Sequence, residues 1–400
     1  MKKNITIRDT IALPKKFRAA GIHAGLKKSG APDMALILSD EPETVAAGVF
    51  TTNQVKAAPV KASKKRVKRG LGRGVVINSG NANACTGKKG EENAEAMIKV
   101  AAAATGVPHQ EMFVCSTGHI GAQLPMDKIM PGIDKLVSGL SSKGGMNATQ
   151  GIMTTDNGPK TGTIRLVIDG KPVVLSALCK GAGMIEPNMA TMLCFVLTDA
   201  KVDRVALQKA LAAAVQDSFN RISVDGDMST NDTVLCFANG AAGNRTLKPG
   251  HRDWNTFNAA LLVLCQRMAW KIIRDGEGAT KVIKVEVTGA RSDKEADAAA
   301  RSVANSLLVK TSWYNDYPNF GRIMDALGYS KARLVEDKVD IDYDGLLIVK
   351  GGLRTAIDVE RVKKVQRKET FTIHINLNLG RGTSHVFGCD CAHAYIDINI

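Results

Sequence analysis

Apolar residues along this chain follow two alternative patterns, and each predicts a different kind of element. Short apolar or alternating runs that end at turn residues predict β-strands at 33–40, 45–53, 112–121 and 282–289. Longer runs with helical spacing lie between them. The sequence therefore indicates a protein that mixes strands and helices.

Several of the predicted helices carry their own start and stop signals. The run 91–106 has acidic residues in its first turn and ends at Gly106, and the run 202–219 begins with Asp203 as an N-cap. Ser292 and Glu295 form the spacing of a capping box at the start of 292–309. These signals predict well-defined helix ends.

The C-terminal part of the chain alternates again and predicts further strands. These are 339–352, 371–382 and, as the last element, 394–400. In the last run, Ile396, Ile398 and Ile400 would share one face and anchor the strand to the core, with Asn399 on the other face.

The grouping of these elements bounds the fold class. A chain of 400 residues is too long for one ordinary core, so we expect two domains or two large packed lobes. Strands occur in groups, helices lie between them, and no fixed-period repeat appears. The pattern favours an α+β layered sandwich over regular βαβ alternation.

Composition narrows the function classes. The net charge of +15 is suited to anionic substrates or nucleic acid, but the densest basic run, 61–73, contains no aromatic residue and no nucleic-acid-binding motif. We therefore expect no nucleic acid partner. The apolar run 257–273 is interrupted by charges and predicts a core helix, so we expect no membrane contact.

The N-terminus and the eight cysteines bear on localisation and metals. The first 17 residues lack the apolar run of a secretory signal, which favours a cytoplasmic protein with reduced thiols. Cys389 and Cys391 are separated by one residue instead of two, and no CxxC pair accompanies them. We expect no metal site.

Glycine- and asparagine-rich loops are the candidates for chemistry, because such loops present backbone N–H groups to negative atoms. No standard nucleotide-binding motif is present; after "KGAGMI", Glu186 occupies the position where a dinucleotide-binding loop needs Gly or Ala. The same segment leads to Ala190-Thr191 at the start of an apolar run. If the bond before Thr191 were cut, its α-amine would become the base for its own hydroxyl. The alternative, an ordinary threonine that opens a strand, remains open on these residues alone.

Longer motifs resemble one family over essentially the whole chain. They include "AAGVFTTNQVKAAPV", "NSGNANACTG", "STGHIGAQLPMDKI", "GIMTTDNGPK", "KGAGMIEPNMATML", "NRISVDGDMSTNDTV" and "RDGEGATK". The chain resembles the bifunctional ornithine acetyltransferase/glutamate N-acetyltransferases of arginine biosynthesis, which are self-cleaving enzymes with an N-terminal threonine nucleophile.

The resemblance implies a layered αββα sandwich and a cut between Ala190 and Thr191. The products would be an α chain, 1–190, with the oxyanion hole and substrate loops, and a β chain, 191–400, with two of each forming a heterotetramer. The implied reaction moves an acetyl group from N2-acetylornithine to glutamate through an acetyl-threonine. No cofactor is implied, and whether acetyl-CoA is a second donor is left open.

Residue roles also follow from the resemblance. Thr191 corresponds to the nucleophile, Thr117 and Gly118 to the oxyanion hole, and the substrate contacts to Thr154, Lys180, Thr191, Glu277 and Asn399. Family chains usually continue past this asparagine to a hydroxyl residue that touches substrate, so we expect that contact to be absent or replaced. A self-cleaving aminopeptidase or amidase of the same fold, in which water accepts the acyl group, is the alternative.

Overall fold

The computed structural model describes residues 5–186 and 192–400, so the predicted cut between Ala190 and Thr191 lies outside the described residues. The chain divides into two compact units, in agreement with the expectation of two lobes. Unit 1 comprises 1–220 and 228–272, and unit 2 comprises 221–227 and 273–400. These units do not coincide with the predicted α and β chains, whose boundary stays a prediction about the protein after cleavage.

Unit 1 is built on two β-sheets. The six-stranded sheet has the order β1 (Ile7–Arg8), β7 (Lys160–Ile168), β8 (Lys171–Lys180), β9 (Leu193–Thr198), β11 (Thr233–Ala238) and β4 (Val45–Phe50). The four-stranded sheet has the order β2 (Phe17–Ile22), β3 (Met34–Ser39), β5 (Gly74–Asn81) and β6 (Met112–His119). Their strands are largely buried because both faces of each sheet are covered.

One apolar core lies between the two sheets. Phe17 and Ile37 from the four-stranded sheet pack in one cluster with Phe195 and Leu235 from the six-stranded sheet. Helix α4 (Gly145–Ile152) contributes to the same cluster and contacts strands of both sheets. This cluster makes the two sheets the inner layers of the unit.

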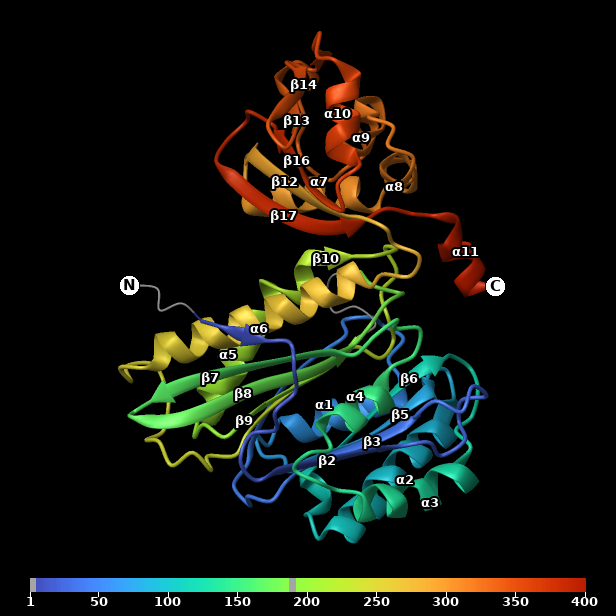
Figure 1. Ribbon diagram of the computed structural model, residues 1–400, viewed down its shortest axis with the longest axis vertical. Helices are drawn as coiled ribbons and strands as arrows, with labels where there is room; N and C mark the ends of the chain where they lie inside the picture. The colour runs from blue at the N-terminus through green and yellow to red at the C-terminus, as the bar shows by residue number, and fades with distance from the viewer. Residues whose placement is uncertain (1–4, 187–191) are drawn as a thin grey trace. The chain divides into compact units, whose positions relative to one another are not determined.

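Helices cover the outer faces of both sheets (Figure 1). Helices α2 (Gly87–Thr105) and α3 (Met126–Ser138) form a second apolar cluster with the four-stranded sheet, and α1 (Ala58–Val67) packs against β6, β4 and α2. On the six-stranded sheet, α5 (Arg204–Gln216) packs on β4, and α6 (Trp254–Arg274) faces β7. The αββα layering and the α+β class are confirmed.

The order of strands around β9 matters for the site. β9 pairs antiparallel with β8, with Lys180 opposite Leu193, and parallel with β11, with Thr233 opposite Leu193. The segment that contains the predicted cut therefore joins two neighbouring strands of one sheet.

Unit 2 has a single seven-stranded sheet. Its order is β10 (Ile222–Ser223), β17 (Gly382–Cys389), β12 (Val282–Ala290), β16 (Thr370–Asn376), β13 (Asp340–Tyr343), β14 (Leu346–Lys350) and β15 (Leu353–Arg354). The other elements are α7 (Asp293–Asn305), α8 (Leu307–Tyr314), α9 (Phe320–Gly328), α10 (Val359–Gln366) and α11 (His393–Asn399).

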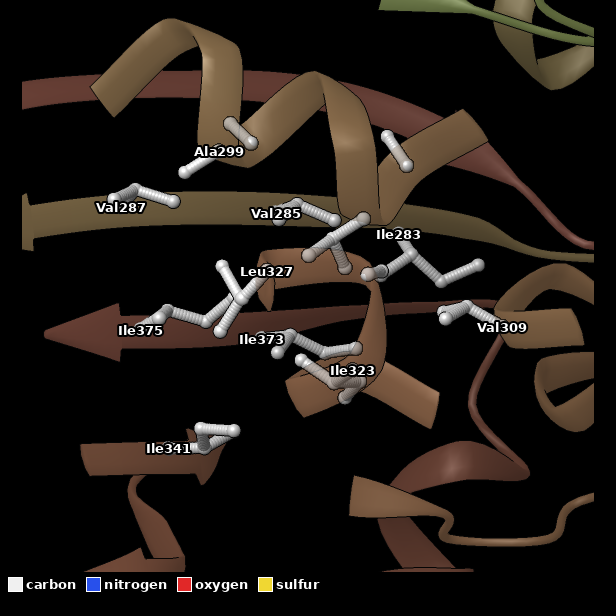
Figure 2. Packing of buried hydrophobic residues seen from close by; sticks show 14 of the residues in the cluster. Ile283, Val285, Val287, Ala299, Val309, Ile323, Leu327, Ile341, Ile373 and Ile375 are labelled. Atoms are coloured by element: carbon white, nitrogen blue, oxygen red, sulfur yellow. The ribbon is translucent and has the colours of Figure 1, made fainter. Parts of the chain in front are cut away.

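Figure 2 shows why the alternating runs of unit 2 form strands. Ile283 and Val285 of β12 and Ile373 of β16 point into a core that Leu327 of α9 completes, and all four side chains are fully buried. Lys284, between the two β12 residues, is only half-buried. The alternation of the sequence thus separates a core face from a more open face.

Several helix ends follow the predicted signals, but α2 begins at Gly87, one turn before the predicted start, so the acidic residues at 91 and 92 are not in its first turn. Asp203 accepts the N–H of Ala206, Ser292 accepts that of Glu295, and Gly106 ends α2 with φ +66°. The predicted helix at 292–309 is two helices, because Ser306 ends α7 and accepts the Val309 N–H as the N-cap of α8.

The prediction of a final strand at 394–400 is wrong. Residues 393–399 form helix α11, and Ile396, Ile398 and Ile400 are exposed instead of buried. Alternation stabilises a strand only where a neighbouring strand offers a ladder, and here β17 already pairs with β12 and β10. The isoleucines therefore do not anchor the C-terminus to the core.

Among the described residues, no helix combines the length and the apolar character that crossing a bilayer requires.

Candidate functional site

Thr117 and Gly118 lie where β6 leaves the four-stranded sheet. Thr117 is buried, whereas Gly118 is exposed. Gly118 has φ +132°, and a Cβ there would lie 2.3 Å from the carbonyl carbon of Gly80 in β5. Only glycine fits this close approach, so the backbone is fixed at the position predicted to form the oxyanion hole.

Lys180 ends β8 in the six-stranded sheet, and its side chain reaches Thr117. Its Nζ donates a hydrogen bond of 3.3 Å to Thr117 Oγ1, and the two residues are only 3% and 2% exposed. This contact joins the ends of strands from the two facing sheets. A buried ammonium there is a fixed positive charge that suits an anionic group.

Asp156 holds this region together. Its Oδ1 accepts from Lys160 Nζ at 2.5 Å and from the Gly181 N–H at 2.8 Å, and its Oδ2 accepts from the Thr154 N–H at 2.9 Å. Burial acts to raise the pKa of Asp156, but the charges of Lys180 and Lys160 outweigh it and lower the pKa to about 2. An ionised carboxylate thus links Thr154 to the residue after Lys180.

A second buried carboxyl belongs to Asp232, the residue before β11, and reaches the residue before β9. Its Oδ1 accepts the Met192 N–H at 3.0 Å, and the residue is fully buried. Burial raises the pKa of this carboxyl well above its usual range, against the opposing effects of the Met192 N–H and the charge of Lys180. The pKa of Asp232 is thus shifted in the opposite direction from that of Asp156.

In unit 2, Glu277 and Asn399 meet. Asn399 Nδ2 donates to Glu277 Oε2 at 2.9 Å and to the Tyr395 carbonyl one turn earlier in α11. Gly278, with φ +67°, lets α11 approach closely, because a Cβ there would lie 2.5 Å from the Tyr395 nitrogen. Helix α11 thus brings together two predicted substrate contacts that lie far apart in the sequence.

The predicted site residues therefore form two sets. Thr117, Lys180 and Thr154 come together in unit 1, and Glu277 and Asn399 come together in unit 2. Ala190 and Thr191 lie outside the described residues. Asp156 and Asp232 were not singled out by sequence reasoning, although both lie within motifs that carry the family resemblance. The sequence feature that could have indicated both residues is an acidic side chain within a glycine- or asparagine-rich segment.

In the part of the chain that the structure describes, neither a cluster of metal ligands nor a disulfide bond is present. No three His, Cys, Asp or Glu side chains there are arranged to hold a metal ion. All eight cysteines are unpaired. Asp390, between Cys389 and Cys391, accepts the N–H groups of Thr280 and Lys281 and so has a structural role.

The layered fold with a buried cluster of polar side chains at the ends of its strands is that of an α+β enzyme. The ArgJ family matches residues 18–400. The arginine biosynthesis bifunctional protein ArgJ of Caldanaerobacter subterraneus subsp. tengcongensis is 44% identical over 97% of this chain and 97% of its own length. The protein of the same name from Geobacter sulfurreducens is 46% identical over 96% and 98%. The chain belongs to the ArgJ family.

Two solved structures are also similar to parts of the chain. The arginine biosynthesis bifunctional protein ArgJ of Bacillus halodurans is 44% identical, with a TM-score of 0.49, over 51% of this chain and 97% of the solved chain. An ornithine acetyltransferase of Mycobacterium tuberculosis, solved with ornithine, is 44% identical, with a TM-score of 0.43, over 46% and 98%.

Proposed function

We propose that this protein transfers an acetyl group from N2-acetylornithine to glutamate in arginine biosynthesis, through an acetyl ester on Thr191. Membership of the ArgJ family supports this reaction over the amidase alternative. The observation that locates the site is the buried contact between Lys180 Nζ and Thr117 Oγ1. Lys180 is the last residue of β8, the strand that precedes the proposed cut.

The first step is self-cleavage. The Thr191 hydroxyl attacks the Ala190 carbonyl, the peptide nitrogen of Thr191 leaves as an amine, and water hydrolyses the resulting ester. The cut yields the α chain, 1–190, and the β chain, 191–400. Pairing of β8 with β9 supports an assembly in which the two chains stay together.

The transfer then proceeds in two half-reactions. The Thr191 Oγ attacks the acetyl carbonyl of acetylornithine while the α-amine takes the hydroxyl proton, and that proton leaves with the ornithine amine. The glutamate amine next attacks the acetyl ester, which regenerates the Thr191 hydroxyl. Thr117 and Gly118 donate to the oxyanion of each tetrahedral intermediate, an effect of roughly 3–4 kcal/mol per donor in related chemistry.

The remaining residues bind the substrates. Lys180 is the cation for the substrate α-carboxylate, and Thr154, held by Asp156, contacts the substrate beside it. Glu277 holds the ammonium of the ornithine side chain, and Asn399 orients the Glu277 carboxylate.

One acetamide replaces another, so the reaction needs no cofactor or metal. We infer that acetyl-CoA is at most an additional donor to the same Thr191. The functional assembly is a heterotetramer of two α and two β chains that acts in the cytoplasm on small molecules. No nucleic acid or membrane partner is part of the proposal.

Substitution of the nucleophile tests the proposal. The purified protein should consist of two chains, the second beginning at Thr191, and Thr191→Ala should remain one chain of 42.6 kDa without transferase activity. Thr191→Ser, which keeps a hydroxyl, is the matched control and should still be cut. Intact-mass analysis distinguishes these outcomes.

The acetyl-enzyme supplies the second readout. With acetylornithine alone, the β chain should gain about 42 Da, the mass of an acetyl group that replaces a hydrogen. An uncut, active protein would refute the proposal. Acetate release without glutamate at the rate of transfer would instead favour the amidase.

A further inference from the structure

A cavity with a basic rim lies at the edge of the six-stranded sheet in unit 1. Strand β4 is the last strand of this sheet, and residues of β4, α1, α5 and the turn after α1 line the cavity. Its volume of about 650 Å³ is in the range of small-molecule sites. The described residues that line it include none that the proposed transfer reaction uses. The cavity therefore does not belong to the candidate site.

Strand β4 forms one apolar wall of the cavity. Ala46, Gly48 and Phe50 are alternate residues of the strand, and all three are buried. The side-chain amide of Gln208 in α5 donates to the Gly48 carbonyl and accepts the Gly48 N–H, each at 3.0 Å. These two bonds tie α5 to the open edge of β4. The wall and the helix beside it thus have a fixed spacing without a ligand.

The remaining lining is strongly basic. Five of the lining side chains are cations: Lys64, Lys68, Arg69, Arg204 and Lys209. Among the described residues that line the cavity, none is acidic. In the described part of the chain, none of these five cations takes part in an ion pair, whereas Lys61 and Arg66 of α1 pair with glutamates of α2. Five positive charges thus surround one cavity.

Arg204 is held at the rim by the turn that follows α1. Its Nη1 donates to the Arg69 carbonyl at 3.1 Å. Gly70 has φ +69°, and a Cβ there would lie 2.9 Å from the Cδ of Arg204. The turn therefore needs glycine for Arg204 to lie across it. Like charges held close together repel one another and destabilise the fold, and a bound polyanion would remove this repulsion.

We propose that this cavity binds a small organic anion that carries two or more phosphate charges and an apolar body, as a nucleoside diphosphate does. Lysine and arginine are the side chains that proteins use to bind phosphate oxygens. Val67 and Val205, together with the β4 wall, offer apolar surface to the rest of the ligand. The charges surround a cavity of small-molecule size, which favours a small ligand over a long polyanion. The site also gives a role to the basic run 61–73, which the transfer reaction does not use.

Calorimetric titration of the full protein with ADP, in the absence of divalent cations, tests the proposal. One ADP should bind per 42.6 kDa of protein, with a Kd below about 1 mM. Added NaCl should weaken binding, because exposed charges are screened. Pyrophosphate, which has the charges but no apolar body, should compete with ADP and bind several-fold more weakly, and orthophosphate should bind more weakly still. None of these results requires the chain to be cut, so a failure here is distinguishable from a failure of the proposed transfer reaction.

Two double variants test whether the ligand lies in the cavity. Lys64→Gln/Lys209→Gln removes one cation from each of the two helices that line it, and should weaken ADP binding at least about tenfold. The matched control, Lys88→Gln/Lys99→Gln, removes two exposed lysines of α2 and lowers the net charge equally, but should leave the Kd within about twofold. All four lysines are exposed, so the Tm and transferase activity of both variants should match those of the unsubstituted protein.

Lysine labelling of the unsubstituted protein gives an independent readout. ADP should protect Lys64, Lys68 and Lys209, but not Lys88 or Lys99, from acylation by acetic anhydride, measured by peptide mass spectrometry. The proposal is wrong if neither ADP nor pyrophosphate binds with a Kd below about 1 mM, if both double variants lose affinity equally, or if protection is uniform. Equal affinities for ADP and pyrophosphate would refute the apolar body of the ligand. Binding of a DNA duplex without binding of ADP would indicate a diffuse basic surface and would also overturn the proposal.

Discussion

Asp156→Asn is the substitution whose consequences can be worked out most fully. The Asp156 side chain is fully buried, and its Oδ1 faces Lys160, whose side chain is only 3% exposed. Asparagine has nearly the same size, but its single oxygen can accept only one of the two backbone N–H groups, of Gly181 and Thr154, that the two Asp156 oxygens hold. It removes the negative charge that Lys160 Nζ contacts at 2.5 Å in the interior.

Two estimates give the size of the effect. A pKa of about 2 against an ordinary 3.8 corresponds to about 2 kcal/mol of interaction in favour of the ionised form. Breaking a buried ion pair by removing one partner typically costs about 3–5 kcal/mol, because the remaining charge is not solvated. We expect D156N to lower the free energy of unfolding by about 3–5 kcal/mol, the larger of the two estimates. Urea denaturation at pH 7 measures this loss.

The pH dependence has a defined sign. The folded-state pKa of Asp156 is lowered, so its contribution is present above the unfolded pKa near 4 and is lost as the pH falls through about 2. The difference between the unsubstituted protein and D156N should therefore shrink by about 2 kcal/mol over this window. A constant difference would show that the charge of Asp156 is not the cause.

Asp9→Asn is the matched control. Hydrogen bonding to Arg267, together with Lys271, also lowers the pKa of Asp9 to about 2, but the Asp9 side chain is 47% exposed. Solvent screening should limit the loss to less than about 1 kcal/mol. Equal losses in D9N and D156N would refute the argument from burial. The double variant D156N/K160M, which removes the buried cation together with the carboxylate, should recover part of the lost stability.

Two further substitutions test the predicted site. Gly118→Ala should lower both Tm and kcat, because its Cβ would overlap the Gly80 backbone at 2.3 Å, whereas Gly121→Ala, with φ +92° and no atom within 4 Å, should cost only about 1–3 kcal/mol of backbone strain and spare kcat. Equal kcat values would remove Gly118 from the oxyanion hole. Asn399→Ala should raise KM for acetylornithine several-fold, because the Glu277 carboxylate loses the hydrogen bond that orients it, and should leave Tm unchanged, because α11 is exposed. The control Asp397→Ala, at a neighbouring exposed position, should change neither quantity. An unchanged KM in N399A would place Asn399 and Glu277 away from the substrate.

Sequence reasoning succeeded where the deciding contacts are local. Asp203 and Ser292 were predicted as N-caps, and both accept the N–H three residues ahead. The glycine after α2 was predicted to end the helix, and it has the left-handed conformation that such an end requires. Caps depend on residues within one turn, so the sequence contains all the information needed.

The failures concern partners that are distant in the sequence. The run 394–400 alternates as a strand would, but no neighbouring strand is available, and its Asn399 finds Glu277, 122 positions earlier. In the sequence, nothing distinguishes Asp156 and Asp232 from other acidic residues in loops. Burial raises the pKa of both carboxyls and the charge of Lys180 lowers both, but at Asp156 the second lysine, Lys160, adds to the lowering. Only the fold brings these groups together.

The position of the proposed cut, between strands that pair within one sheet, changes how the protein can fold. In the uncut chain, β8 and β9 find each other through a short connection, so the entropy of bringing them together is small. After the cut, the same pairing is an association of two molecules, and refolding depends on protein concentration. The precursor would then be the form that folds, and the lifetime of the cut protein would be set by its rate of unfolding. Cleavage would be an irreversible step. The protein would become catalytically competent only after the uncut chain has folded once.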